Sequence, residues 1–111
     1  LSHLGRHSLE KFGGVKSVEY LVKNFNVDPD NLMVWLSPAA GRKNYPLSSF
    51  EGKSLQQVAK EQLASAGIRT SSVAASSIDT TKNDSYFSHS QFLSGGRKED
   101  GRFAVVAIIE K

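Results

Sequence analysis

The sequence predicts an α/β (α+β) fold in which a mixed sheet is covered by helices. Two segments have the apolar spacing of helices, three have the apolar character of strands, and the two kinds succeed one another along the chain. Turn-forming residues separate them. The 111 residues suffice for one domain with one core but not for two. We therefore expect residues 1–111 to form a single domain.

The first helix is expected at residues 15–25. Its apolar residues recur three and four positions apart, as one buried helical face requires, and they are Val15, Val18, Leu21, Val22 and Phe25. Asp28-Pro29-Asp30 follows, and proline biases the residue before it away from helical backbone. The helix should therefore end before this turn.

The first strand is expected at Leu32–Leu36, a continuous apolar run bounded by turn residues. Such runs are typical of strands buried on both faces, so we expect a central position in the sheet. Residues 37–52 then form a polar, irregular stretch. Long loops in small domains are often functional, which makes this stretch a candidate site.

A second helix is expected at residues 55–66. Ser54 and Gln57 form a capping-box pattern at its start, and Gly67 offers a stop at its end. Residues 68–75 alternate loosely and predict a second strand, and residues 76–85 are rich in turn formers and predict a loop.

The last strand is expected at Arg102–Ile109, which is strongly apolar and rich in β-branched residues. Aromatic residues lie among polar groups at residues 86–92, and a Gly-rich, charged connection covers residues 93–101. With this strand the sheet would have three members.

Composition excludes several classes of function. The chain has no cysteine, so disulfides, thiolate nucleophiles and sulfur-rich metal sites are excluded within it. No apolar run approaches the roughly 18 residues of a membrane span. No secretory signal is evident, and we expect a cytoplasmic protein. The net charge of +3 comes from dispersed Lys and Arg without interleaved aromatics, so a nucleic-acid partner is not expected.

The histidines are the first candidates for chemistry. His3 and His7 are four residues apart, a spacing that would place two metal ligands on one helical face with Glu10 one turn further. Two solvated imidazoles would give the same pattern, and Gly5 argues against a regular helix there. The third, His89, lies among serines between aromatic residues. In extended backbone adjacent side chains point to opposite faces, so the His89 imidazole would not reach the Ser88 hydroxyl, and Ser88 is a poor candidate for a nucleophile.

Two polar segments have alternative interpretations. Residues 79–81, Asp-Thr-Thr, would suit either a phosphate or sugar hydroxyl or, more commonly, a capped turn. Gly95-Gly96-Arg97 would suit either an anion or a plain connection, and no helix is expected to begin there and supply a dipole.

Four motifs in order resemble those of the laccase-domain family, also called multicopper polyphenol oxidases. Ser2–His7 is similar to the family's His-Ala-Gly-Trp-Arg-Gly, and Leu32–Gly41 resembles its strand with a Gly-Pro-Ala-Ile-Gly turn. Tyr86–His89 resembles Phe-Phe-Ser-Tyr/His, and Gly101–Ala104 resembles Gly-Arg-Met-Ala before the last strand. The chain is thus similar to the C-terminal half of a laccase-domain protein.

The resemblance implies a zinc-dependent purine nucleoside phosphorylase with adenosine deaminase side activity. His3 would be a zinc ligand and, with His89, a catalytic residue, while Arg42, Tyr45 and Ser88 would bind phosphate and nucleoside. The family's other zinc ligands, a His and a Cys, come from an N-terminal half. The resemblance therefore implies that a longer parent chain or a second subunit, as in a homo-oligomer, would complete the site.

The sequence also departs from the family pattern, so a divergent member with reduced or lost activity is expected. Arg6 stands where the family has Trp, His7 where it has Arg, Lys43-Asn44 where it has a Cys pair, and Ser90 where it has Arg. The alternative is a non-catalytic α/β module that binds a nucleotide or a protein partner. A third possibility, a zinc-dependent hydrolase or a copper oxidase, is disfavoured, because copper sites of that kind need several His and usually a Cys, and the chain has three His.

Overall fold

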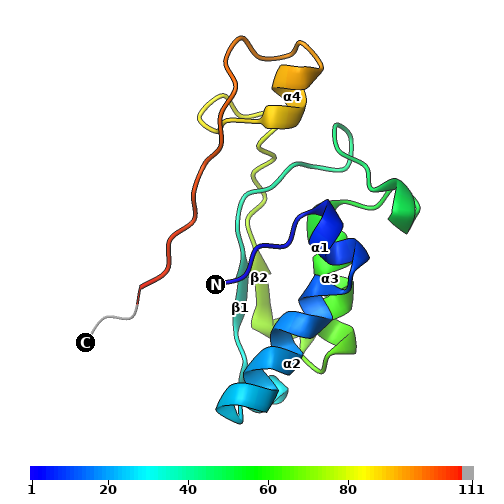
Figure 1. Cartoon of the computed structure of the whole chain (residues 1–111), viewed down its shortest axis with the longest axis vertical. Helices are drawn as coiled ribbons and strands as arrows, with labels where there is room; N and C mark the ends of the chain where they lie inside the picture. The colour runs from blue at the N-terminus through cyan, green and yellow to red at the C-terminus, as the bar shows by residue number, and fades with distance from the viewer. Residues whose placement is uncertain (109–111) are drawn as a thin grey trace.

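The computed structural model describes residues 1–108, in which four α-helices and two short strands are joined by 3₁₀ turns (Figure 1). The α/β class expected from the sequence is confirmed. The elements in chain order are α1 (Arg6–Glu10), α2 (Gly13–Phe25), η1 (Pro29–Asn31), β1 (Val34–Leu36), η2 (Ser48–Phe50), α3 (Leu55–Ser65), η3 (Thr70–Ser72), β2 (Val73–Ala75) and α4 (His89–Leu93).

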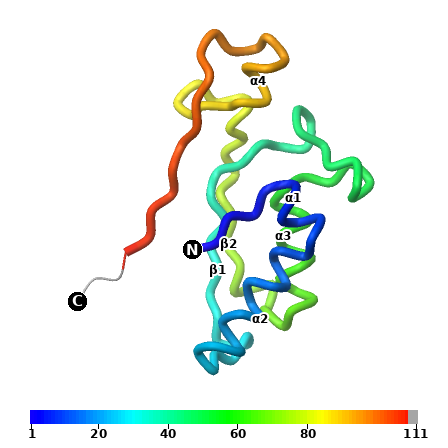
Figure 2. Tube along the Cα trace, viewed as in Figure 1, coloured from blue at the N-terminus to red at the C-terminus, as the bar shows by residue number. Residues whose placement is uncertain are grey.

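The sheet consists of β1 and β2, which are parallel, with Trp35 opposite Ala74. Figure 1 shows α1, α2 and α3 together on one side of these strands. The carboxyl ends of both strands point toward the part of the molecule that carries α4. The trace in Figure 2 shows that the segments after β1 and β2 both leave the sheet in that direction. The loops that follow β1 and β2 are thereby brought together.

The two helices predicted from apolar spacing are confirmed. α2 begins two residues earlier than expected, directly after Phe12, whose φ of 61° turns the chain away from α1. At Gly13 a Cβ would lie 2.8 Å from the Ser8 carbonyl oxygen, so this close turn requires glycine. α3 begins at the predicted cap, where the Ser54 hydroxyl accepts a hydrogen bond from the Gln57 N–H.

The core lies between the helices and the sheet, in two clusters of buried side chains. Leu36 packs against both clusters, and Val34 and Val73 add the inward face of the strands to the second one. Burial of this apolar surface provides the main driving force for folding. The clusters are Leu9, Leu47, Val58 and Ala59, and Val18, Leu63 and Ile68.

The expectation that the first strand is buried on both faces is wrong. Leu32, Val34 and Leu36 face the helices, but Met33 is 87% exposed and Trp35 60% exposed. Alternation of this kind is typical of a strand with one covered face. The physical reason is that the described helices of this layer cover one side of the strands only (Figure 1).

The expected third strand is not formed in residues 102–108, which have no regular structure. Val106 is 82% and Ile108 83% exposed, while position 109 lies outside the described residues. Strand propensity expresses packing against neighbours, and no described strand pairs with this segment. The sheet therefore has two strands in the described part of the chain.

Smaller differences concern β2 and α4. The segment 68–75 forms a 3₁₀ turn first and becomes β2 only from Val73. α4 lies where the sequence indicated aromatic residues among polar groups, and the loop expected at 76–85 is confirmed. In residues 1–108, no helix combines the length and apolar character that crossing a membrane would require.

Candidate functional site

The loops that follow β1 and β2 are joined at the carboxyl end of the sheet. The Thr80 N–H donates to the Ala39 carbonyl over 3.0 Å, and the Ala39 N–H donates to the Ile78 carbonyl over 3.4 Å. Ligands of open α/β folds commonly bind at this end of the strands. A hollow of about 70 Å³ lies there, lined in part by Gly41, Gln56 and Asp79.

Asp79 ties these two loops together. Its Oδ1 accepts hydrogen bonds from the Gly41 N–H (3.0 Å), the Thr81 N–H (2.9 Å) and the Thr81 hydroxyl (2.6 Å). Thr80 and Thr81 are buried. The capped-turn interpretation of residues 79–81 is confirmed, and these buried threonines are not exposed to a phosphate or sugar.

The hydrogen bonds also hold Asp79 in its ionised form. Partial burial alone would raise the pKa of its carboxyl, but the bonds from the Thr81 hydroxyl and from the Gly41 and Thr81 amides, with Lys82 nearby, together lower that pKa. A carboxyl with a lowered folded-state pKa stabilises the fold at neutral pH.

Stability should therefore depend on pH through Asp79. Its contribution is fully present above the pKa of the unfolded chain, about 3.9, and is lost as the pH falls through the lower folded-state pKa. We expect the difference in unfolding free energy between the wild type and Asp79→Asn to shrink as the pH is lowered from about 6 to about 3. Urea unfolding across this range measures it, and a constant difference would contradict the assignment.

Gly41→Ala should break the same junction. A Cβ at Gly41 would overlap the Asp79 carboxylate, which cannot retreat without losing its three donors. We expect a loss of about 2 kcal/mol, of the size that overpacking costs. Thermal unfolding measures this, with Gly52→Ala as a contrast in which nothing lies within 4 Å and the strain comes from a φ of 77° alone. Unchanged stability of Gly41→Ala would contradict the overlap.

The loop after β1 carries two of the predicted substrate-binding residues. Arg42 is exposed, and its Nε donates to the Gly52 carbonyl over 3.0 Å. The Tyr45 N–H donates to the Gly41 carbonyl over 3.0 Å, and its side chain packs against the core cluster that contains Leu47. Arg42 is thus accessible to an anion, whereas Tyr45 is partly committed to packing.

The beginning of α4 carries the other two residues near the predicted motif. Ser88 is buried and caps the helix by accepting a hydrogen bond from the Gln91 N–H, and its hydroxyl lies 3.3 Å from that of Ser90. His89 turns elsewhere, because its Nδ1 lies 2.8 Å from Oδ1 of Asp100. The geometry agrees with the expectation that Ser88 is not a nucleophile activated by its neighbour.

Asp100 is a partner of His89 that the sequence did not indicate. The hydrogen bond from His89, with those of the Gly101 N–H and Arg102, lowers the pKa of the Asp100 carboxyl. The residue lies 11 positions after His89, beyond a Gly-rich connection. The only available signal was a carboxylate at the end of that connection, and spacing alone does not indicate such a pairing.

Arg97 fixes the loop beneath α4. Its guanidinium donates to the carbonyls of Thr80 (3.0 Å), Asn83 (3.3 Å) and Tyr86 (2.7 Å), and only 16% of its side chain is exposed. The anion-binding interpretation of Gly95-Gly96-Arg97 is therefore wrong, because carbonyl oxygens occupy the guanidinium. The segment is a connection, with Gly95 at a φ of 86° just after the helix.

The donor set around His3 does not fit a metal ion by itself. His3 precedes α1, whose cap is Gly5, so His3 and His7 do not share a helical face. The His7 side chain is exposed and lies 3.9 Å from Glu10. Across residues 1–108, no group of three or more His, Asp or Glu could hold a metal. A metal bound at His3 would need ligands from outside the described residues.

The five predicted site residues lie in three places, namely the segment before α1, the loop after β1 and the start of α4 (Figure 1). Within the described chain no hydrogen bond or ion pair joins any two of them; they are His3, Arg42, Tyr45, Ser88 and His89. The structure pairs His89 with Asp100, while the Ser88 hydroxyl contacts Ser90 and Gln91, and His3 lies apart from all of these in its contacts.

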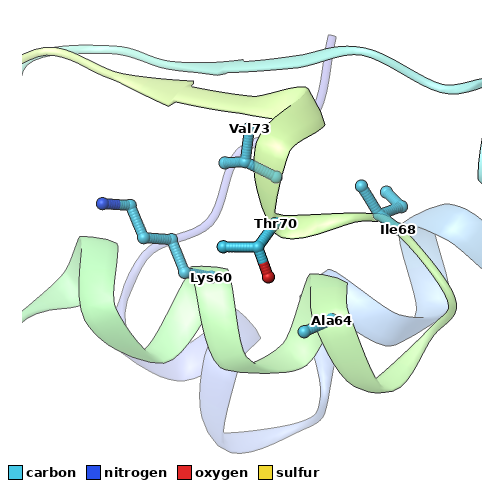
Figure 3. A pocket seen from close by; sticks show the side chains of 5 residues that line it. All are labelled: Lys60, Ala64, Ile68, Thr70 and Val73. Atoms are coloured by element: carbon cyan, nitrogen blue, oxygen red, sulfur yellow. The ribbon is translucent and has the colours of Figure 1, made fainter.

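A second hollow, shown in Figure 3, lies between α3 and β2 and has a volume of about 80 Å³. Its lining is mainly aliphatic, and Lys60 reaches along it from α3. Pockets for organic ligands usually measure roughly 300–1,000 Å³, so this hollow does not hold a nucleoside. The lining residues are Lys60, Ala64, Ile68, Thr70 and Val73.

Fold and site together define a small α/β protein with an exposed histidine–aspartate pair at α4. Residues 51–110, more than half of the chain, match the family model described as multi-copper polyphenol oxidoreductase laccase. The chain belongs to this family. Searches of curated proteins and of solved structures gave no match. The matched region contains α3, β2 and α4, so it includes Ser88, His89 and Asp100.

Proposed function

We propose that this chain contributes to a site for phosphorolysis of purine nucleosides, with hydrolytic deamination of the nucleoside, which releases ammonia, as a side reaction. The observation that carries the proposal is the exposed His89, held by Asp100 in a member of the laccase family. A histidine whose one ring nitrogen is engaged keeps the other for proton exchange with a substrate.

The reaction needs a proton donor more than a protein nucleophile. A phosphate oxygen bonds to C1′ of the ribose, the C1′–N9 bond breaks, and its electron pair stays on the purine. The purine takes a proton from His89, and the proton that the phosphate carried restores the imidazolium. Arg42 is an exposed cation that suits the phosphate, and Tyr45 and Ser88 would border the nucleoside.

Zinc enters this proposal only with ligands from outside the described residues. His3 would contribute one imidazole, and a longer parent chain or a second subunit would supply the others. The family description names copper, and the described residues alone fit neither metal. No step above depends on the ion.

Two measurements test the proposal. Elemental analysis after dialysis, with the mass in solution, gives the zinc content per chain, and near-stoichiometric zinc would support shared ligation. An assay with adenosine and inorganic phosphate then follows free adenine and inosine. We expect phosphate-dependent release of adenine, reduced about 100-fold in His89→Asn. Absence of turnover even with zinc and the completing partner or parent region present would contradict the proposal.

The second candidate is a non-catalytic module that binds a nucleotide or a protein partner. It is favoured by the small hollows and by the lack of a metal-holding group within residues 1–108. Calorimetry with adenosine discriminates the two functions. Binding without phosphate-dependent turnover favours the module, whereas turnover favours the phosphorylase.

A further inference from the structure

The pairing of His89 with Asp100 is built by the surrounding chain. Gly101 lies so close to the Phe87 ring that a Cβ on it would be 2.5 Å from ring carbons. Phe103 packs edge-to-face on Tyr86, with ring centroids 5.3 Å apart. Residues 100–103 are therefore fastened to residues 86–89 by contacts on either side of the pair.

The carboxylate is itself held in place. Its Oδ1 accepts hydrogen bonds from the Gly101 N–H (2.8 Å) and from Arg102 Nη1 (3.2 Å), in addition to its contact with His89 Nδ1 (2.8 Å). Because an ionised carboxylate only accepts hydrogen bonds, the proton of a neutral His89 must reside on Nδ1. Nε2 then carries a lone pair.

We propose that Asp100 is a positioning residue that fixes His89 in the Nδ1–H tautomer and presents Nε2 for proton exchange with a purine nucleoside. The carboxylate orients the ring through Nδ1, as second groups do for histidines that act as acid or base. The tautomer assignment stands on the geometry of this chain, and the role toward a nucleoside rests on the proposed function.

The tautomer is measured directly in the full chain. Long-range ¹H–¹⁵N correlation spectra, recorded where the imidazole is neutral, distinguish a protonated Nδ1 from a protonated Nε2. We expect the Nδ1–H form to dominate for His89 in the wild type and to give way to a mixture in Asp100→Ala and Asp100→Asn. Glu99→Gln removes the adjacent exposed carboxylate and should leave the spectrum unchanged.

A second variant moves the carboxylate without removing it. Gly101→Ala keeps the carboxylate but displaces it through the Phe87 ring, and it should shift the tautomer in the same direction. A wild type dominated by the Nε2–H form, or an Asp100→Ala spectrum identical to the wild type, would overturn the proposal.

Turnover then separates this proposal from the function on which it rests. We expect Asp100→Asn to lower kcat for adenosine phosphorolysis about 10-fold with little change in KM, and to add no further loss to His89→Asn. A fixed tautomer without turnover, with zinc and the completing partner or parent region present, supports positioning and contradicts the phosphorylase function. Turnover in a protein whose His89 tautomer is unchanged by substitution of Asp100 supports the phosphorylase function and contradicts positioning.

Discussion

Replacing Gln62 with leucine is expected to lower the free energy of unfolding by about 3 kcal/mol. Gln62 is buried on α3, where its Nε2 donates to the Leu9 carbonyl over 2.8 Å and its Oε1 accepts from the Gly14 N–H over 2.9 Å. These two backbone groups flank the break between α1 and α2. Leucine would fill the volume but leave the Gly14 N–H buried without a partner, which costs about 1–3 kcal/mol. The Leu9 carbonyl would lose one of its hydrogen bonds, worth about 0.5–1.5 kcal/mol, and keep the one from the Phe12 N–H (3.0 Å).

Urea unfolding of Gln62→Leu measures the effect, and Gln57→Leu is the matched control. Gln57 lies on the same helix with an exposed side chain. The same substitution there changes helix propensity but leaves no buried polar group without a hydrogen-bond partner. We expect the control to stay within about 0.5 kcal/mol of the wild type. Equal losses in the two variants would contradict the bridging role of Gln62.

The example of Gln62 shows why the helices were predictable and their junction was not. α2 and α3 follow from apolar spacing within about a dozen residues, and the Ser54 cap follows from local chemistry. Gln62 falls on the apolar face of that same period. Its partners lie 48 and 53 residues away, and no local pattern indicates that a polar residue there will satisfy a helix break.

The strands show the complementary failure. Apolar residues at 32–36 and 102–108 indicate a tendency to be covered, but not what covers them. Within the described chain, helices cover one face of β1, so Trp35 stays exposed, and no strand pairs with residues 102–108. Because successive side chains of a strand point to opposite faces, Met33 and Trp35 share one face, but both are apolar, so the sequence does not indicate that this face is uncovered.

The candidate site was half predictable for a similar reason. Ser88 and His89 are adjacent in sequence and were identified together, whereas Asp100 reaches His89 only because Gly101 and Phe103 fasten a later segment to the rings before it. The Asp79 turn was predictable because its hydrogen bonds to Thr81 are two residues long, but its bond to Gly41 spans 38 residues. Contacts of that range require the fold.

Arg97→Ala is the second substitution with a large expected effect. The Arg97 guanidinium donates hydrogen bonds to the carbonyls of Thr80, Asn83 and Tyr86. Its ion pair with Asp84 adds little stability, because the two groups are 3.8 Å apart and the Asp84 side chain is 99% exposed. Hydrogen bonds from a charged donor are worth about 1.5–3 kcal/mol, so we expect a loss of about 2 kcal/mol even after water reaches some of the carbonyls. Urea unfolding measures the loss, with exposed Lys98→Ala as its control.

Arg97→Lys distinguishes the shape of the guanidinium from its charge. An ammonium group keeps the positive charge but lacks the planar fork that reaches the Thr80, Asn83 and Tyr86 carbonyls at once, so lysine should restore less than half of the stability lost in alanine.

Because the same loop leads directly into Ser88 and His89, amide hydrogen exchange at residues 80–86 should accelerate in both variants, as local opening becomes easier. Full recovery by lysine would mean that charge alone, through Asp84, holds the loop. Slow exchange in the alanine variant would mean that the junction at Asp79 orders the loop without Arg97.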